Sequence, residues 1–474
     1  MRVYLYGSGN RCKTLLELVG LSDVIISGIV DSNPDRCGAW INGYEIMNTD
    51  YIKNCTNEYV CVTFFGENDN EPIWDELIEK YNISENRVLS FHDLIRIIYQ
   101  KMIAMPMLSV KNSKCVKAII AGAWIFGMGG VETWINETYS VLAQRNNNIY
   151  LLTREKQYIG THEGAKNVIN YYIKDSCNFK KNRVEITIRK LINMSPCVLI
   201  CSRADEVLLS ASLLHKAYPN SFRIIAVIHG ACDGIIRDFY AYNEEIEKYL
   251  CVSTSIQKTL VGLGVRIERT EIITSPISRF FKKKRHYSLK KEKPVKIGYA
   301  GRIEVFHKRS DLLCLLIKKL EQLNVNYYFE IVGDGSFVPR LKQFIEENYL
   351  SEKINYKGLL DRKNIFDFWK DKDIAINVSD SEGRPISNIE AMMCGTVPVV
   401  TSTAGILDDV INGVTGYTVD IGDMDSMACV IGFLAENRNI IKEIGKKAQE
   451  SMRMKTDTQA YVKRWNEILW RDEK

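Results

Sequence analysis

The sequence predicts an α/β protein in which helices cover both faces of parallel sheets. Apolar runs of strand length alternate with amphipathic segments of helix length along the 474 residues, which is the pattern that such sheets produce. The pattern restarts three times, each time with a strand that leads into a turn rich in glycine or arginine. These strands are Val3–Tyr6, Lys117–Ala121 and Val295–Ala300. A single hydrophobic core rarely extends beyond about 250–300 residues, so several domains are expected.

The three restarts divide the chain into three domains and a closing helix. The expected boundaries are 1–105, 115–290, 294–450 and 451–474. Each domain has the alternation of strands and helices of a Rossmann-like fold, and the first is the smallest. The closing helix carries apolar residues at helical spacing, so we expect one of its faces to pack against another part of the protein.

Short apolar runs bounded by turn residues mark the strands of each domain. In the first domain we expect strands at Val3–Tyr6, Ile25–Val30 and Tyr59–Phe64. In the second we expect Lys117–Ala121, Ile149–Thr153, Val198–Cys201, Ile224–Ile228 and Tyr249–Val252. In the third we expect Lys296–Ala300, Tyr328–Val332, Ile354–Tyr356, Ile374–Val378 and Val397–Thr401.

Composition excludes several classes of protein. Charged residues make up 26% and apolar residues 46% of the chain, as in an ordinary globular protein. The net charge of +5 is small, and no zinc-finger or basic-region pattern indicates nucleic acid. The most apolar stretch, 118–131, is too short for a bilayer span and is interrupted by glycines. Thirteen scattered cysteines, and a first strand in place of a signal peptide, favour the reducing cytoplasm.

A basic stretch separates the second domain from the third. Between residues 279 and 293, eight Lys or Arg residues are opposed only by Glu292. The simpler interpretation is a solvated linker. The alternative is peripheral attraction to an anionic membrane surface, where each nearby basic residue adds roughly 1 kcal/mol.

The first domain carries part of a nucleotide-binding pattern. Gly7 and Gly9 follow the first strand, where paired glycines let the backbone approach a phosphate, and Asp31 ends the second strand, where a carboxylate can hold a ribose. Cys12 stands where the third glycine of that pattern would be. The stretch is similar to the small nucleotide-binding domain at the N-terminus of bacterial sugar acetyltransferases. Two interpretations stay open: an accessory nucleotide site at Gly7, Gly9 and Asp31, and a folded module used for docking or oligomerisation.

The densest functional motif lies in the third domain. The strand Ile374–Val378 leads into Glu382-Gly383-Arg384-Pro385, and a helix then begins near the proline and carries Glu390 about one turn in. The two carboxylates are eight positions apart. We therefore expect both to face the same crevice at the carboxyl end of the strand.

Positive groups are expected around the same crevice. The backbone N–H groups of Ile386 to Asn388 at the helix start form a positive end for a phosphate or a sugar hydroxyl. Arg302 stands just past a strand, and Lys308 stands in the loop that follows. Breaking a bond to a diphosphate leaves negative charge on it, and fixed cations stabilise that charge.

The combination of the two glutamates, the intervening Gly and Pro, and the following strand Val397–Thr401 resembles the signature of glycosyltransferase family 4. The likeness covers about 115–470. It implies the GT-B fold, in which two Rossmann-like domains face a cleft, with the acceptor domain at 115–290 and the donor domain at 294–450. It also implies that the closing helix returns to the acceptor domain.

The resemblance implies a retaining transfer from a nucleotide diphosphate sugar, with a UDP-sugar as the expected donor, to a glycan or lipid-linked acceptor in surface polysaccharide or glycolipid assembly. Glu390 would grip the donor ribose, Glu382 would contact the transferred sugar, and Arg302 and Lys308 would clamp the diphosphate. His229 matches the active-site histidine of the family, although a histidine at a strand end is often structural. The other implied donor contacts are Gly129, Gly130, Gly333, Leu359, Gly383, Arg384, Pro385, Ile386 and Ser387, of which the glycine turns are also explained by packing alone.

No catalytic metal or other cofactor is expected. Asp371 and Asp373 precede a strand, whereas a metal-binding pair would follow one, and Asp423 suits a helix cap. The hypothesis is that the donor ionises toward an oxocarbenium-like state and that the departing phosphate takes the acceptor proton on the same face, without a protein nucleophile. Two other functions stay open: a catalytically silent GT-B partner subunit, and a nucleotide-sugar epimerase.

Overall fold

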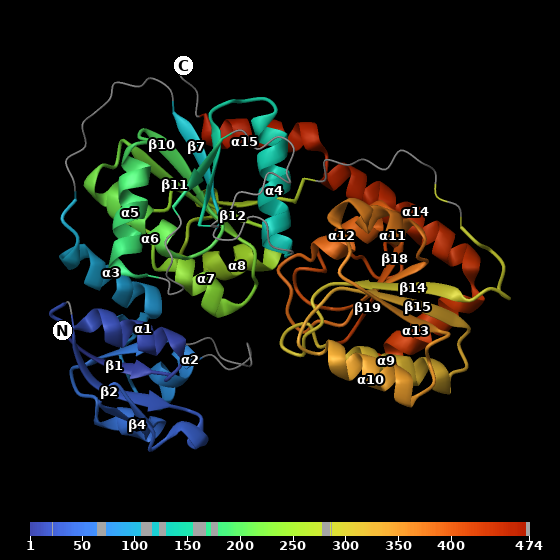
Figure 1. Ribbon diagram of the computed structural model, residues 1–474, viewed down its shortest axis with the longest axis horizontal. Coiled ribbons are helices and arrows are strands. Elements are labelled where there is room, and N and C mark those ends of the chain that lie inside the picture. The colour runs from blue at the N-terminus through green and yellow to red at the C-terminus, as the bar shows by residue number, and fades with distance from the viewer. Residues whose placement is uncertain are drawn as a thin grey trace. The chain divides into compact units, whose positions relative to one another are not determined.

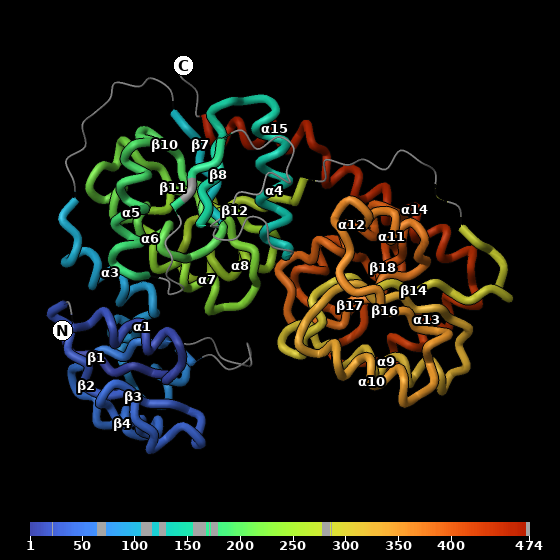
Figure 2. The backbone as a smooth tube through the Cα atoms, viewed as in Figure 1, coloured from blue at the N-terminus to red at the C-terminus, as the bar shows by residue number. Residues whose placement is uncertain are grey.

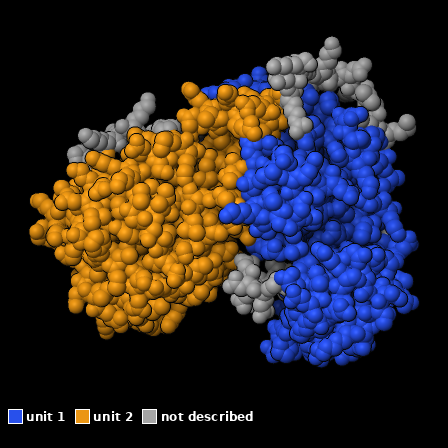
Figure 3. Space-filling model, turned by 180° about the vertical axis from the view of Figure 1, so that it is seen from behind, with its two compact units in different colours: residues 1–228, 232–251, 257–271 blue, residues 229–231, 252–256, 272–474 orange. Residues whose placement is uncertain are grey.

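The computed structural model describes residues 1–20, 22–63, 73–105, 116–122, 129–154, 167–171, 179–276, 285 and 287–470. The chain divides into two compact units (Figure 3). Unit 1 consists of Met1–Ile228, Cys232–Cys251 and Gln257–Glu271, and unit 2 consists of His229–Ala231, Val252–Ile256 and Ile272–Lys474. Each unit is described by itself below.

The first sheet of unit 1 has six strands in the order β3-β4-β2-β1-β5-β6. All neighbouring pairs are parallel except β3 with β4. The strands are β1 (Arg2–Tyr6), β2 (Ile25–Asp31), β3 (Trp40–Ile41), β4 (Tyr44–Asn48), β5 (Tyr59–Val62) and β6 (Val88–Ser90). The helices are α1 (Asn10–Val19), α2 (Ile73–Asp75) and α3 (Phe91–Met102), and the chain can be followed through them in blue in Figure 2.

The second sheet of unit 1 has seven strands in the order β13-β12-β11-β10-β7-β8-β9. They are β7 (Lys117–Ala121), β8 (Ile149–Thr153), β9 (Val168–Asn170), β10 (Cys197–Cys201), β11 (Phe222–Ile228), β12 (Lys248–Cys251) and β13 (Thr270–Ile272). The helices are α4 (Gly130–Ala143), α5 (Lys181–Ile192), α6 (Glu206–Ala217), α7 (Asp233–Tyr240) and α8 (Thr254–Gly262), whose first residues belong to unit 2.

Unit 2 contains one parallel sheet in the order β16-β15-β14-β17-β18-β19. Its strands are β14 (Val295–Ala300), β15 (Tyr327–Val332), β16 (Ile354–Gly358), β17 (Ile374–Asn377), β18 (Val397–Thr401) and β19 (Tyr417–Val419). Its helices are α9 (Asp311–Gln322), α10 (Val338–Glu347), α11 (Ile365–Lys370), α12 (Ile386–Met393), α13 (Met424–Glu436), α14 (Arg438–Lys455) and α15 (Thr458–Leu469).

Helices cover both faces of the sheet of unit 2. Figure 1 shows α9, α10 and α13 on one face and α11, α12 and α14 on the other. On the first face, Leu316 and Ile431 join a core cluster with Phe329 of β15. On the second, Met392 of α12 packs in a cluster with Val400 of β18. Burial on both faces explains why β17 and β18 are mostly apolar along their length, whereas β14 and β15 each include one charged residue, Lys296 and Glu330.

Partly buried ion pairs join the first sheet of unit 1 to the second. Arg11 of α1 contacts Asp238 of α7 at 2.6 Å, and Arg96 of α3 contacts Glu245 at 2.6 Å. Burial raises the pKa of the Asp238 carboxyl to about 6, although the Arg11 charge opposes the shift. The first six strands form a sheet of their own, and these ion pairs join it to the second sheet within unit 1, a contact that the prediction of a domain at 1–105 did not specify.

The predicted strands all exist, with ends that differ by one or two residues. The strand expected to end at Phe64 ends at Val62, and Phe64 lies outside the described residues. Short strands at the sheet edges were not predicted, for example β9, β13 and β19, because three residues carry too little periodicity. Within the described residues, no helix has both the length and the apolar character to cross a bilayer. The return of α15 to the acceptor domain stays a prediction.

Candidate functional site

The predicted site residues of unit 2 gather at the carboxyl ends of β14 and β17. These two strands are neighbours in the parallel sheet, so the loops that follow them lie at the same edge. The loop after β14 carries Arg302 and Lys308, and the loop after β17 carries Glu382 and leads into α12. Ligands of open parallel sheets bind at this edge.

Arg302 presents an exposed guanidinium at this edge. Its backbone carbonyl accepts a hydrogen bond from the Tyr299 hydroxyl at 2.7 Å, which fixes the start of the loop. Its side chain is 58% exposed and contacts Glu304 at 2.8 Å. Burial raises the pKa of the Tyr299 hydroxyl, and the charges of Glu382 and Arg302 both act on it. Arg302 and Glu382 are therefore both within electrostatic range of one buried tyrosine.

Lys308 contacts Glu382 directly. The ammonium nitrogen lies 2.6 Å from Oε1 of the carboxylate, and the side chains are 20% and 9% exposed. The residues on either side, His307 and Arg309, have φ of 58° and 47°, in the left-handed region that non-glycine residues rarely adopt. The loop thus bends sharply on both sides of Lys308, and such strained backbone is common at functional sites.

Two residues that the sequence analysis did not select also hold Glu382. Asn377 Nδ2 lies 3.2 Å and Ser379 Oγ lies 2.7 Å from the same Oε1 atom. A sequence signal for them did exist: both are side-chain donors at the end of a predicted strand, within five positions of the predicted carboxylate.

Helix α12 begins beside the carboxylate, as predicted. Pro385 is its N-cap, and the side chain of Glu390, one turn in, is largely buried. The N–H groups of Asn388 and Ile389 donate to the Pro385 carbonyl, so the expectation that Asn388 offers a free N–H is wrong. No described residue accepts from the N–H groups of Ile386 and Ser387. These two groups form the positive end of the helix.

Close backbone packing brings Gly383 against His229. A Cβ atom at Gly383 would lie 1.7 Å from the carbonyl oxygen of His229, and a Cβ atom at Gly405 would lie 1.8 Å from the Gly383 carbonyl oxygen. Only glycine fits at either position. Since His229 belongs to the segment of the chain grouped with unit 2, the predicted histidine and the predicted glutamate loop are neighbours.

Gly333, Leu359 and Arg302 all follow the carboxyl ends of strands in this sheet. Gly333 follows β15 with φ of 140°, and a Cβ atom there would lie 1.8 Å from the Gly301 carbonyl oxygen. Its N–H donates to the Gly358 carbonyl at 2.9 Å, next to Leu359, which is 53% exposed. Packing accounts for Gly333, while the exposed Leu359 is available to a ligand.

Arg384 has a structural partner. Its guanidinium forms a bidentate ion pair with Asp409, with distances of 2.7 and 2.5 Å, and the two side chains are only 5% and 4% exposed. It also donates to the Val252 carbonyl at 3.2 Å. The sequence grouped Arg384 with the donor contacts, but these bonds explain the residue without any ligand.

Gly129 and Gly130 begin α4 in unit 1. Gly129 is the N-cap, and a Cβ atom there would lie 2.2 Å from Oε2 of Glu132. The Glu132 carboxylate thus folds back over the turn, where it pairs with Arg203. The preceding residues of the glycine-rich turn, 123–128, lie outside the described residues.

The carboxylate in the partial nucleotide pattern of the first sheet has hydrogen-bond partners within the same pattern. Asp31, largely buried at the end of β2, accepts hydrogen bonds from the Ser8 N–H at 2.8 Å, the Ser8 hydroxyl at 2.5 Å and the Asn33 N–H at 2.9 Å. Burial alone would raise the pKa of Asp31, but these bonds outweigh it and lower the pKa. The carboxylate expected to hold a ribose thus fastens the turn between Gly7 and Gly9, and the accessory nucleotide site stays a prediction.

The aspartates that resembled metal ligands have other partners. Asp371 contacts Lys296 at 2.6 Å, and Asp373 contacts Arg438 at 3.4 Å. Asp423 accepts from the Ser426 N–H at 2.9 Å and caps α13, as predicted. Within the described part of the chain, no group of three or more His, Cys, Asp or Glu side chains is arranged to hold a metal.

Comparisons with known proteins find two family models along the chain. Residues 280–451 match the family model described as Glycosyl transferases group 1, and residues 1–89 match the model described as C2185-like, N-terminal. The O-antigen biosynthesis glycosyltransferase WbnH of Escherichia coli is 26% identical over 306 residues, which are 60% of this chain and 81% of WbnH.

Two solved structures show the fold. TarM has a TM-score of 0.63 at 13% identity, covering 75% of this chain and 99% of TarM. HepE from Anabaena, solved in complex with UDP and glucose, has a TM-score of 0.62 at 16% identity, with 75% and 99% covered. The fold is the GT-B arrangement that the motif resemblance implied.

Proposed function

We propose that this chain, a glycosyltransferase with the GT-B fold, transfers a sugar from a UDP-sugar to a glycan or lipid-linked acceptor with retention of anomeric configuration. The observation that carries the proposal is the contact between Lys308 and Glu382, beside the exposed Arg302 and the start of α12. A cation for the leaving group and a carboxylate for the sugar stand side by side at one sheet edge.

The charges suit the departure of a diphosphate. As the bond between the anomeric carbon and the phosphate oxygen breaks, negative charge grows on the diphosphate and positive charge on the sugar ring. Arg302, Lys308 and the N–H groups of Ile386 and Ser387 stabilise the first, and the Glu382 carboxylate contacts the sugar that carries the second. These cations make a metal ion unnecessary in the proposed step. Glu390 is assigned to the ribose hydroxyls of the donor.

Retention follows if attack and departure occur on one face of the sugar. The acceptor hydroxyl oxygen forms the new bond to the anomeric carbon, and its proton passes to the departing phosphate oxygen. No covalent intermediate with the protein is needed, which differs from the two-carboxylate mechanism of retaining glycosidases.

The relatives support the donor and the setting. HepE was solved with UDP and glucose, and WbnH is named for O-antigen biosynthesis. We therefore assign this chain to surface polysaccharide or glycolipid assembly. A cytoplasmic location is part of the proposal, in keeping with the described cysteines, all of which are free thiols. Peripheral membrane contact through the basic stretch also stays a proposal, because most of that stretch lies outside the described residues.

The test is an assay of the full chain with several UDP-sugars, with and without glycan-lipid extracts. We expect UDP release that depends on the acceptor, and proton NMR should show the anomeric configuration of the donor in the product. An inverted linkage would refute retention. Release of UDP with a free, epimerised sugar would identify an epimerase, and nucleotide binding without turnover would identify a silent subunit.

Arg302→Ala tests the role of the exposed guanidinium. We expect kcat to fall about 10²–10³-fold, the usual effect of removing one electrostatic stabiliser of a transition state. Arg340→Ala on α10 is the matched control, since its side chain is 59% exposed, almost as in Arg302. Equal activity of the two variants would contradict the assignment.

A further inference from the structure

The Glu382 carboxylate is held by one of its two oxygens only. Lys308 Nζ, Ser379 Oγ and Asn377 Nδ2 lie 2.6, 2.7 and 3.2 Å from Oε1. No described residue donates a hydrogen bond to Oε2. The carboxylate is thus fixed on one side and open on the other.

Two of the three donors are neutral and almost completely buried. Asn377 is the last residue of β17 and is 6% exposed, and Ser379 is 2% exposed. Asn377 Oδ1 accepts from the Ser379 N–H at 2.9 Å, and the Ser379 carbonyl accepts from the Thr401 hydroxyl at the end of β18. The two donors are therefore fixed to each other and to the neighbouring strand.

In the proposed reaction, Lys308 interacts with the diphosphate as well as with Glu382. When a diphosphate binds, the Lys308 ammonium must also contact the phosphate oxygens. A carboxylate held by Lys308 alone would move with that ammonium. Asn377 and Ser379 are almost completely buried, and both donate to Glu382. A phosphate of the donor would therefore not compete with Glu382 for their hydrogen bonds.

We propose that Asn377 and Ser379 are positioning residues, which hold Oε1 of Glu382 so that Oε2 faces a hydroxyl of the transferred sugar whatever Lys308 contacts. This inference rests on the proposed function. It predicts a division of roles: Lys308 serves the leaving group, and the Asn377–Ser379 pair serves the placement of the sugar. Loss of the pair then slows the chemical step without weakening the binding of the nucleotide.

The experiment compares Ser379→Ala, Asn377→Ala and Ser379→Thr in the full chain. For each variant, kcat and KM are measured with the UDP-sugar that the wild type uses, together with the Kd of UDP and the Tm. We expect kcat to fall about 10–100-fold in the two alanine variants, as for loss of a hydrogen bond to a charged group, with an unchanged Kd for UDP. Ser379→Thr should recover most of the rate because it keeps the hydroxyl.

Ser381→Ala is the matched control, since it removes a hydroxyl from the same loop that makes no described hydrogen bond to Glu382. Unchanged kcat in both alanine variants would overturn the inference. So would a parallel loss of UDP affinity and Tm, or failure of the threonine variant to recover activity, because each indicates a merely structural role. If the wild type itself transfers no sugar from any donor, the proposed function fails first, and the two failures are distinguished.

Discussion

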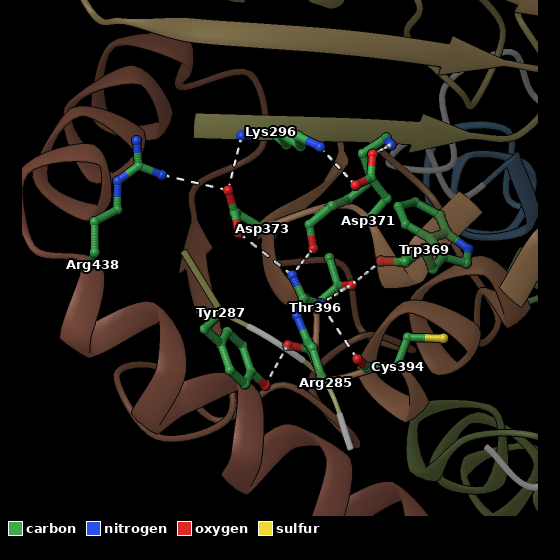
Figure 4. A network of polar contacts seen from close by, with 11 residues as sticks. Arg285, Tyr287, Lys296, Trp369, Asp371, Asp373, Cys394, Thr396 and Arg438 are labelled. Atoms are coloured by element: carbon green, nitrogen blue, oxygen red, sulfur yellow. Dashed lines mark hydrogen bonds and ion pairs between the residues drawn. The ribbon is translucent and has the colours of Figure 1, made fainter. Parts of the chain in front are cut away.

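The two ends of the sheet in unit 2 carry the same kinds of charged groups and use them differently. At the carboxyl end, the Arg302 side chain is 58% exposed and Glu382 keeps one oxygen without a described partner. At the amino end, the side chains of Arg285, Arg438 and Asp373 are 4%, 3% and 11% exposed. Figure 4 shows this second network.

At the amino end, protein groups satisfy the charges. Asp373 accepts from the Lys296 N–H at 3.0 Å and lies 3.4 and 3.5 Å from Arg438 and Arg285. Arg285 also donates to the Thr396 hydroxyl at 2.8 Å. Burial lowers the pKa of both guanidinium groups, and Asp373 opposes that shift. Arg285 and Arg438, which pair with a buried carboxylate, therefore stabilise the fold. Arg302, which is exposed, is available to bind a ligand.

The largest effect should come from breaking the amino-end network. Asp373→Asn leaves two buried guanidinium groups without their carboxylate, so we expect the free energy of unfolding to fall by about 3–5 kcal/mol. Urea unfolding measures this. The control is Asp361→Asn, whose side chain is 70% exposed and pairs with the similarly exposed Lys363, and whose loss should cost less than about 1 kcal/mol. Equal losses in the two variants would remove the distinction drawn between buried and exposed pairs.

A change at the carboxyl end should affect activity instead. Lys308→Ala should lower kcat about 10²–10³-fold by removing a cation from the leaving group, with a far smaller loss of stability than Asp373→Asn. Steady-state kinetics and thermal unfolding of the same samples check both halves of the statement. Lys319→Ala on α9, with a side chain 28% exposed against 20% for Lys308, is the control and should retain full activity.

Acidification should lower the free energy of unfolding of unit 2 because it protonates Glu330 on β15. Burial alone would raise the pKa of this carboxyl, but hydrogen bonds from Lys357 and Lys372 outweigh it and lower the pKa below the usual 4.5. The stabilisation is therefore present above pH 4.5 and is lost as the pH falls through the lowered value. Glu330→Gln should lose roughly 1.5–3 kcal/mol at pH 7, and the difference from the wild type should shrink on acidification. Parallel stability curves between pH 7 and 3.5 would contradict this.

The smallest effect is expected for Lys296→Ala. Its side chain is 44% exposed and contacts Asp371, which is 57% exposed. Exposed pairs contribute about 0–1 kcal/mol, and salt screens them. Thermal unfolding at low and high salt should therefore give nearly the same Tm for this variant and the wild type.

Much of the fold was predictable because central strands buried on both faces leave apolar runs in the sequence. Glu382, Arg302 and Lys308 could each be placed after a predicted strand, and the resemblance to a known family grouped them into one site. The structure does bring Lys308 to Glu382.

What escaped prediction depends on contacts between residues far apart in the sequence. Arg384 finds Asp409, 25 positions later, and Arg11 finds Asp238, more than two hundred positions later. Neither pairing has a periodic signal. The hydrogen bonds that Asp31 accepts from Ser8 likewise have no periodic signal in the sequence. The roles of Asn377 and Ser379 were missed because short polar residues after a strand are common in any turn.

The ion pairs between the two sheets of unit 1 also bear on how the chain can be shortened. Asp238 and Glu245 are buried and obtain their arginines from α1 and α3. A chain without its first hundred residues would lose both arginines and would expose the surface that carries the two acids. The second sheet is therefore expected to be less stable alone than in the full chain.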